Sequence, residues 1–550
     1  MEWVVKRSDA WINSVLLAAF TVCAPFLHVP PVGAADKKDV QDMFHTSDRC
    51  VACHNMLKDS KGNDISIGLD WSASIMANSA RDPYWQGSLR RETLDHPEVS
   101  DDIQDECSTC HMPMQHLMDR AAGRKTAVFA RLPLSNEHLH NAAAKDGVSC
   151  SVCHLIKSDH LGSKASFNGN VTVASLEDLR NRPEYGPFLV DAGHKQVMQS
   201  STAGFVPTQA AHMRDAGLCG SCHTLYTVAL GAGGKDVGQL AEQMPYLEWL
   251  HSDYKGRQTC QDCHMPPVSG AVPVTALYGP PREGMHLHVF VGGNFLMERI
   301  FEEHASELAV EAQPRELQDA VKRAEEFMRR ESARVTLSGL TKTDDGVAFD
   351  VTVDNLTGHK LPTAYPSRRA WLHVTVRGAG GNLVFESGAL RPDGSIEGND
   401  NDADAKKFEP HYTEITRPDE VEIFEPILKG PQGEVTTGLL TAVGYLKDNR
   451  ILPSGFDKAT AVPDIAVAGR AAQDPNFTGG SARVRYSVKA AGAGPFQITA
   501  ELWYQPVGYR WAHNLAAYKA AEPERFVRYY EEQSANSALV VASAQGSLNE

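Results

Sequence analysis

Residues 146–154 read Asp-Gly-Val-Ser-Cys-Ser-Val-Cys-His, and the last five of them form a Cys-x-x-Cys-His motif. The two thiols of this motif stand about one helical turn apart, and a histidine follows directly. This spacing lets both thiols bond the vinyl groups of one haem while the imidazole binds its iron. The motif therefore predicts covalent attachment of haem c.

The same motif occurs five times along the chain, with the other copies at 50–54, 107–111, 219–223 and 260–264. Ten of the eleven cysteines lie in these motifs, and the last, Cys23, lies in an apolar leader. Disulfides and zinc sites also use paired cysteines, but neither explains a histidine directly after the second cysteine in every copy. We therefore predict five covalently bound haem c groups.

The predicted attachment residues comprise ten cysteines and five proximal iron ligands. They are Cys50, Cys53 and His54; Cys107, Cys110 and His111; Cys150, Cys153 and His154; Cys219, Cys222 and His223; and Cys260, Cys263 and His264.

The length and charge of the chain limit its class. A chain of 550 residues exceeds the usual size of one domain, so at least two domains are expected. The formal net charge of −16 argues against nucleic acid as a partner. An acidic surface of this kind serves either solubility or the docking of a basic redox partner.

The N-terminus has the pattern of a secretory signal. Lys6 and Arg7 precede an apolar run over about 11–27, and Val-Gly-Ala at 32–34 resembles a cleavage site. We therefore predict a signal peptide over 1–34 and export to the periplasm or the cell surface. The apolar run is short for a bilayer, and no later stretch approaches 18 apolar residues, so no stable transmembrane span is expected.

Residues 35–300 are predicted to form a pentahaem cytochrome c domain that is irregular or mostly α-helical. Gly, Pro, Asn and Asp are scattered between the motifs, and few long periodic segments occur. In such a segment the haem groups are expected to take the place of an apolar core. Bridging helices are predicted over 301–333, where Pro314 opens a segment whose apolar residues recur at helical spacing.

From about Arg334 the apolar residues alternate with a period of two, which predicts strands with one buried face. We therefore expect an antiparallel β-sandwich domain over 334–550, with a helix at 523–534. The predicted strands lie at 347–353, 370–376, 382–386, 420–424, 482–488 and 496–504.

Each haem has a sixth iron position, and its ligand separates an electron carrier from an enzyme. Further histidines near the motifs are the expected distal ligands. His359 lies in a Thr-Gly-His-Lys-Leu-Pro turn after a predicted strand, so it either reaches across to complete a haem or is a surface residue. The candidate distal ligands are His45, His138, His140, His212, His286, His288 and His359.

The chain resembles the multihaem cytochromes c related to the tetrahaem acceptor of hydroxylamine oxidoreductase, in the architecture that fuses a haem domain to a β-rich domain. This resemblance implies bis-histidine haems, electron transfer and an exported location. The chain differs from pentahaem nitrite reductases in lacking a Cys-x-x-Cys-Lys motif, and from octahaem enzymes in its motif count. The matching stretches are 71–85, 107–114, 146–154, 219–226, 260–267, 357–371 and 447–453.

The sequence thus predicts an exported pentahaem c-type cytochrome that moves electrons along closely packed, mostly bis-histidine haems in a respiratory chain. Its expected partners are redox proteins, either other cytochromes or a quinol-linked membrane complex, and it can form oligomers. One alternative is an oxidoreductase in which one haem has an open site for a small nitrogen or sulfur compound. Another is a subunit of an extracellular cytochrome filament. Electron transfer is favoured over catalysis.

Overall fold

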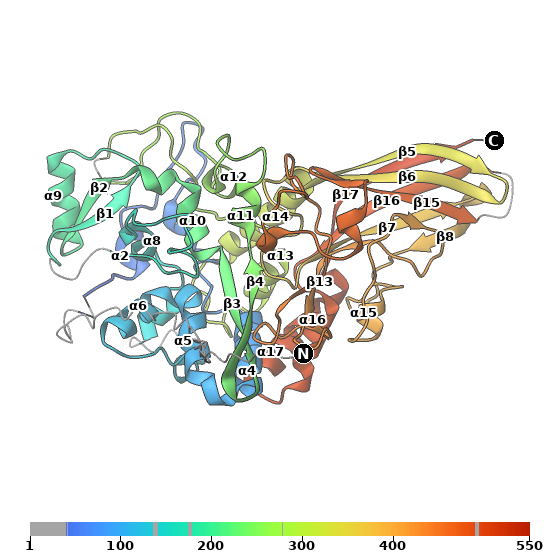
Figure 1. The fold of residues 1–550 in the computed structure, drawn as a ribbon. Helices are drawn as coiled ribbons and strands as arrows, with labels where there is room; N and C mark the ends of the chain where they lie inside the picture. The colour runs from blue at the N-terminus through green and yellow to red at the C-terminus, as the bar shows by residue number, and fades with distance from the viewer. Residues whose placement is uncertain are drawn as a thin grey trace, which may run out of the picture.

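The computed structural model describes residues 40, 42–135, 141–173, 179–277, 279–489 and 494–549. The predicted signal peptide, His138 and His140 lie outside the described residues. Short helices occupy one end of the elongated molecule and long strands the other (Figure 1). We call residues 42–303 the N-terminal region and residues 333–549 the C-terminal region.

The N-terminal region consists mainly of short helices joined by turns. The longest, α4, begins where the Asp82 carboxylate accepts the backbone N–H groups of Tyr84 and Trp85, with Pro83 in its first turn. No helix in the described ranges is both long and apolar enough to cross a bilayer. The helices are α2 (Ser47–Val51), α3 (Ile67–Ser72), α4 (Pro83–Asp95), α5 (Ser100–His111), α6 (Pro113–Ala121), α7 (Ala142–Lys145), α8 (Cys150–Leu155), α9 (Ala192–Ser201), α10 (Ala216–Cys222), α11 (Pro245–Leu250) and α12 (Cys260–His264).

Two small sheets lie among these helices, and the sequence analysis predicted neither. Strand β1 (Arg182–Gly186) pairs in parallel with β2 (Phe205–Gln209). Strands β3 (Leu225–Gly231) and β4 (Lys235–Gln243) form an antiparallel hairpin that starts directly after the fourth motif. In Figure 1 this hairpin runs through the middle of the molecule.

Two helices connect the regions, α13 (Phe295–Glu303) and α14 (Pro314–Glu331). They pack against each other, and α14 also contacts α3 and β17. The predicted helix that starts at Pro314 agrees with α14. Its apolar stripe buries Leu317, Ala320, Ala324 and Met328, as helical spacing requires.

The C-terminal region contains two five-stranded sheets. All pairs in them are antiparallel except β9 with β15. One sheet has the order β14 (Phe477–Thr478), β15 (Ser481–Lys489), β6 (Gly346–Asn355), β5 (Ala333–Thr343), with β9 (Glu414–Ile415) beside β15. The other has the order β10 (Ile423–Phe424), β7 (Arg369–Arg377), β16 (Phe496–Gln505), β17 (Leu539–Leu548), with β8 (Leu383–Ser387) beside β7. A third, small sheet joins β12 (Val435–Thr436), β11 (Pro426–Lys429) and β13 (Gly444–Asp448).

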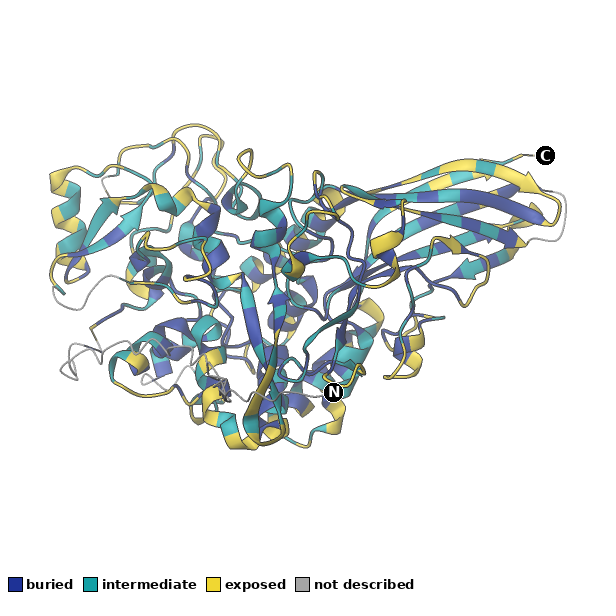
Figure 2. Ribbon diagram, in the orientation of Figure 1, coloured by how far each residue is buried: buried dark blue, intermediate teal, exposed yellow. Residues whose placement is uncertain are grey.

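The two larger sheets share one apolar core. Phe349 of β6 stacks on Tyr486 of β15 with ring centroids 5.3 Å apart. Phe385 of β8, a strand of the other sheet, also contacts Tyr486, with ring centroids 6.3 Å apart. Buried and less buried residues alternate along these strands (Figure 2). The alternation that predicted β6, β7, β15 and β16 therefore reflects one face turned toward this core.

Two predictions for the C-terminal region differ in detail from the structure. The predicted run at 420–424 forms a strand only at its end, in β10. The predicted last helix is α17 (Ala521–Gln533), but β17 follows it and pairs with β16. Helix α17 packs on α4, where Arg90 and Glu522 form an ion pair at 2.9 Å, so this helix of the C-terminal region lies against the N-terminal region. Two short helices, α15 (Asp400–Ala403) and α16 (Tyr509–His513), complete the region.

Candidate functional site

Each of the five motifs lies on a short helix or at the end of one, in α2, α5, α8, α10 and α12. Residues three apart on a helix share one face, so the two thiols of each motif lie on the same side. Helix α2 packs against α8, and α10 packs against α12, which brings motifs distant in sequence together. The fold therefore gathers the motifs.

The motif histidines are held in one orientation by the backbone. Four of them place Nδ1 against a carbonyl oxygen, so that Nδ1–H donates and Nε2 keeps a free lone pair, as metal-binding imidazoles require. The Nδ1···O pairs are His54 with Val274 (2.6 Å), His111 with Ser79 (3.1 Å), His154 with Tyr185 (2.5 Å) and His264 with Val291 (2.7 Å).

Burial keeps these imidazoles neutral. It lowers the pKa of His111 to about 4 and also lowers the pKa values of His54, His154 and His264. Burial, followed by the charges of His264 and Arg368, lowers the pKa of His223 to about 4. A neutral imidazole is the form that binds a metal.

Thiols of different motifs lie next to one another. Burial, followed by the nearby Cys222 thiol, raises the pKa of Cys153 to about 12, which places the third motif beside the fourth. Hydrogen bonds between thiols, followed by burial, raise the pKa values of three further cysteines: Cys150 through Cys50, Cys110 through Cys222, and Cys219 through Cys260. The fourth motif thus neighbours the second, third and fifth, and the first neighbours the third.

A glycine leaves room where two of these motifs meet. A Cβ at Gly169 would stand 3.5 Å from the Cys110 sulfur and 3.9 Å from the Cys222 sulfur, and only 2.7 Å from Thr109. Gly169 also has φ of +70°, which favours glycine. The paired thiols and the oriented neutral imidazoles are a donor set that fits covalently bound haem. The glycine keeps the space beside two of these thiols free of a side chain.

His359 stands opposite the fifth motif histidine, although it belongs to the C-terminal region. The rings of His264 and His359 are nearly parallel, at 13°, with centroids 6.2 Å apart. A metal bound between two imidazole nitrogens at about 2 Å each separates the ring centroids by roughly 6 Å. Nδ1 of His359 lies 2.9 Å from the Lys360 carbonyl oxygen, so Nε2 is the available nitrogen in both rings.

Burial, followed by the His264 charge, lowers the pKa of His359 to about 4. His359 lies just beyond the end of β6, in the turn that the sequence singled out. The structure thus brings together a motif histidine and a candidate distal histidine from opposite regions.

Two more candidate distal ligands also leave Nε2 available. Nδ1 of His286 lies 2.6 Å from the Met265 carbonyl oxygen, and Nδ1 of His288 lies 3.1 Å from the His286 carbonyl oxygen. Burial, followed by the charge of His154, lowers the pKa of His288 to about 3. His288 therefore lies in the interior near the third motif.

The remaining described candidates are oriented differently. Nε2 of His45 lies 2.6 Å from the Thr202 carbonyl oxygen, and Nε2 of His212 lies 2.9 Å from that of Ile156. In these orientations Nδ1 is the nitrogen left for a metal. The His45 carbonyl accepts the Ser151 hydroxyl at 2.7 Å, which places His45 beside the third motif.

Sequence reasoning missed a buried group of charged side chains beside His359. The ammonium group of Lys360 lies 2.7 Å from the Asp448 carboxylate, which also pairs with Arg450 at 2.8 Å. Arg450 in turn lies 3.2 Å from the carboxylate of Glu248 in α11. Lys360, Asp448 and Arg450 belong to the stretches 357–371 and 447–453, whose charged residues were the available signal.

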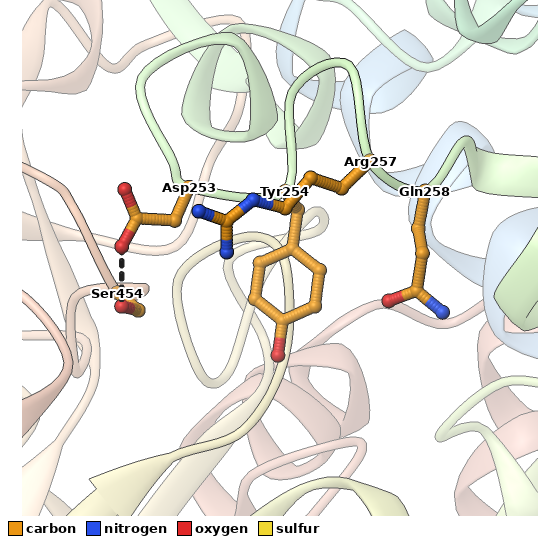
Figure 3. Close-up of a pocket in the computed structure, with 5 residues that line it drawn as sticks. All are labelled: Asp253, Tyr254, Arg257, Gln258 and Ser454. Carbon is orange, nitrogen blue, oxygen red and sulfur yellow. Dashed lines mark hydrogen bonds between the residues drawn. The ribbon is translucent and has the colours of Figure 1, made fainter.

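A cavity of about 230 Å³ lies near the same turn, where the Tyr254 hydroxyl donates to the Leu356 carbonyl oxygen at 2.6 Å (Figure 3). It is lined by Asp253, Tyr254, Arg257, Gln258 and Ser454. Ser454 donates to the Asp253 carboxylate at 2.8 Å, and the Arg257 guanidinium extends between Asp253 and Tyr254 (Figure 3). The cavity therefore lies at the boundary between the two regions, directly before the fifth motif.

Comparison with known proteins gives one informative result. No protein-family model matches the sequence, and no curated protein matches it. The fold is similar to that in a crystal structure of a penta-heme cytochrome c552 from Thermochromatium tepidum, with a TM-score of 0.51 and 15% sequence identity. The match covers 92% of this chain and 100% of that chain. At this identity the similarity is one of fold.

Proposed function

We propose that this chain is a multihaem c-type cytochrome that transfers electrons, with one haem c bound at each of the five motifs. The observation that carries the proposal is the gathering of the motifs, with hydrogen bonds between thiols of three pairs of motifs. The fold similarity to a pentahaem cytochrome supports it.

The side chains named above would hold these groups. The thiols attach each macrocycle, and the carbonyl-oriented imidazoles present Nε2 to its iron. When bound, haem iron supplies reversible one-electron chemistry. The neighbour relations of the thiols support a branched order of the haem sites: the first beside the third, the third beside the fourth, and the fourth beside the second and fifth.

We assign His264 and His359 as the two residues that would hold the iron of the fifth haem. An iron held by both imidazoles would have no position for substrate, which favours electron transfer over catalysis at this site. His45, His138, His140, His212, His286 and His288 remain the proposed distal ligands for the other haems.

The exported location, the signal peptide over 1–34 and redox protein partners in a respiratory chain belong to this proposal. So does a sandwich arrangement of the two five-stranded sheets, which the contact between Phe385 and Tyr486 supports. The domain limits proposed from the sequence are 35–300, 301–333 and 334–550.

A second candidate function is reduction or oxidation of a small oxyanion at an open haem. Its supporting observation is the Arg368 guanidinium, whose charge contributes to the lowered pKa values of His223 and His264. Arg368 donates to the Thr363 carbonyl oxygen at 3.0 Å. A cation near two iron ligands is a feature that an oxyanion site needs.

Low-temperature electron paramagnetic resonance of the purified ferric protein separates the two functions. We expect every haem to be low-spin and unaffected by nitrite or hydroxylamine. We expect His359→Ala to convert one haem to a high-spin form that binds added imidazole, with the haem count per chain unchanged. A high-spin haem in the unmodified protein that shifts with nitrite would favour the enzyme instead.

A further inference from the structure

The turn that carries His359 is fixed to its own region by backbone and amide hydrogen bonds. The Asn355 side-chain amide donates to the His359 carbonyl oxygen at 2.8 Å and to that of Ile451 at 2.9 Å. Leu361 and Ile451 exchange two backbone hydrogen bonds, each 2.9 Å long. Residues 355–361 and 448–451 therefore behave as one unit, but these bonds do not connect it to the N-terminal region.

The Tyr254 hydroxyl makes one such connection, because it donates to the Leu356 carbonyl oxygen at 2.6 Å. Glu248 of α11 makes three more. Its Oε2 accepts the backbone N–H of Lys360 at 3.1 Å and the hydroxyl of Thr363 at 2.5 Å. Its Oε1 lies 3.2 Å from the Arg450 guanidinium. One carboxylate thus contacts the residue next to His359 and both segments of the unit.

The helix that carries Glu248 also braces the motifs. Helix α11 packs against α10, and a Cβ at Gly220 in the fourth motif would stand 2.6 Å from the Tyr246 ring. The chain then runs from α11 through residues 251–259 into α12, which holds the fifth motif. Glu248 therefore links the turn of His359 to the backbone that supports His223 and His264.

The charges of this group balance inside the protein. The side chains of Lys360 and Glu248 are fully buried, and those of Asp448 and Arg450 are 2% and 5% exposed. Burial alone would raise the pKa of Asp448, but Arg450 and Lys360 hold it well below its usual value. Two cations and two carboxylates offset one another, so loss of one leaves an uncompensated buried charge.

We propose that Glu248, Lys360, Asp448 and Arg450 form a clamp that positions His359 against the iron of the fifth haem. This inference rests on the proposed ligation of that haem by His264 and His359. The clamp residues are positioning residues, because they act through the turn and touch neither the iron nor the macrocycle in this assignment. Glu248 is the clamp member that belongs to α11, so its loss removes the hydrogen bonds from that helix to Lys360 and Thr363.

The test uses the full-length haem-loaded protein and the Glu248→Ala variant. We expect one of the five haems to gain a high-spin ferric signal and a shifted reduction potential, while the other four keep their spectra and the haem count stays unchanged. Glu248→Gln keeps an acceptor for Lys360 N–H and the Thr363 hydroxyl, so it is expected to retain most of the low-spin signal. This recovery distinguishes positioning from general loss of structure.

Glu425→Gln is the matched control. Glu425 is also buried and pairs with Lys447 at 3.1 Å, and both residues belong to the C-terminal region. We expect this variant to be less stable and spectrally unchanged. If Glu248→Ala does not fold, Thr363→Val removes a single hydrogen bond to the same carboxylate, and we expect a smaller high-spin fraction.

The outcomes separate this inference from the proposed function. If His359→Ala leaves all haem spectra unchanged, the ligation assignment fails, and the clamp fails with it. If His359→Ala converts one haem whereas a folded Glu248→Ala or Thr363→Val variant converts none, only the clamp fails. A change in all five haems of Glu248→Ala would also overturn it.

Discussion

The two regions of the molecule are built on different principles. In the N-terminal region the motif helices α2 and α12 have five residues each, whereas β6 and β16 in the C-terminal region have ten each. The strands share one large apolar core with α13 and α14. Apart from the residues that join this core, the apolar clusters among the described residues of the N-terminal region are small, such as the one of Leu57, Ile65, Val272 and Met285.

This contrast shows what each region needs in order to fold. The alternating strands bury their own side chains and thereby stabilise themselves. Short helices with small clusters bury too little apolar surface to offset the entropy of an ordered chain. In the proposed function, five haems supply the missing apolar surface.

The largest expected effect comes from removing one haem site. Changing both Cys150 and Cys153 to Ala should lower the haem content by one per chain, because α8 then lacks both attachment thiols. Hydrogen exchange of the variant should quicken in α2, α8 and β1, which pack together, and stay unchanged in β6 and β16. The measurements are the haem-to-protein ratio and exchange mass spectrometry.

An unchanged haem ratio would refute attachment at this motif. Equal loss of protection in β6 and β16 would show that both regions depend on haem, and the contrast between them would not hold.

A cavity in the shared core should have a smaller but still large effect. Phe349 is fully buried in the apolar core, so Phe349→Ala is expected to lower the free energy of unfolding by about 3–5 kcal/mol. Circular dichroism during guanidinium denaturation measures this change. Leu189→Ala is the control, since its side chain is 72% exposed and should cost less than about 0.5 kcal/mol. A loss below about 1 kcal/mol for Phe349→Ala would mean that the strands do not depend on this core.

The smallest effect concerns pH and a buried histidine of the C-terminal region. Both ring nitrogens of His411 meet buried carboxylates, Glu422 at 2.7 Å and Asp474 at 2.9 Å. Burial alone would lower the pKa of His411, but these carboxylates raise it above the usual value. The Asn449 amide also faces this group and donates to Glu422 at 2.8 Å.

Because the folded-state pKa is raised, His411 stabilises the fold fully below about pH 6.5, and this contribution is lost as the pH rises through the folded-state pKa. His411→Gln should therefore lower the free energy of unfolding by about 1.5–3 kcal/mol at low pH and by less in alkaline solution. Denaturation midpoints of both proteins between pH 6 and pH 9 test this. A cost independent of pH would show that His411 is neutral in the fold.

The sequence predicted more of the C-terminal region than of the N-terminal region. Strands β6, β7, β15 and β16 follow from alternation, because one face of each is buried in the apolar core. Strand β17 was not predicted, since its half-buried positions include Ala542, Ala544 and Gly546 instead of large apolar residues. The hairpin of β3 and β4 was not predicted, because it lies between two motifs in a segment that was expected to be irregular or helical.

The candidate site was predictable only in part. The motifs are local patterns, and their residues could be named from the sequence alone. His264 and His359 belong to two different regions of the molecule. The sequence therefore indicated that His359 lies in a glycine turn, but not that this turn faces His264. The contacts of the clamp could not be predicted for the same reason. Glu248 and Lys360 are 112 residues apart, and the sequence does not indicate that either side chain is buried.

The contacts between thiols of different motifs bear on how the chain matures. In oxidising surroundings, neighbouring thiols such as Cys50 with Cys150, or Cys219 with Cys260, can join as disulfides between motifs. Each wrong bridge would disable two attachment sites at once. Thioether bonds formed earlier would leave no thiol for this reaction. The arrangement therefore favours a biogenesis in which the cofactor is joined to an extended chain, and compaction follows.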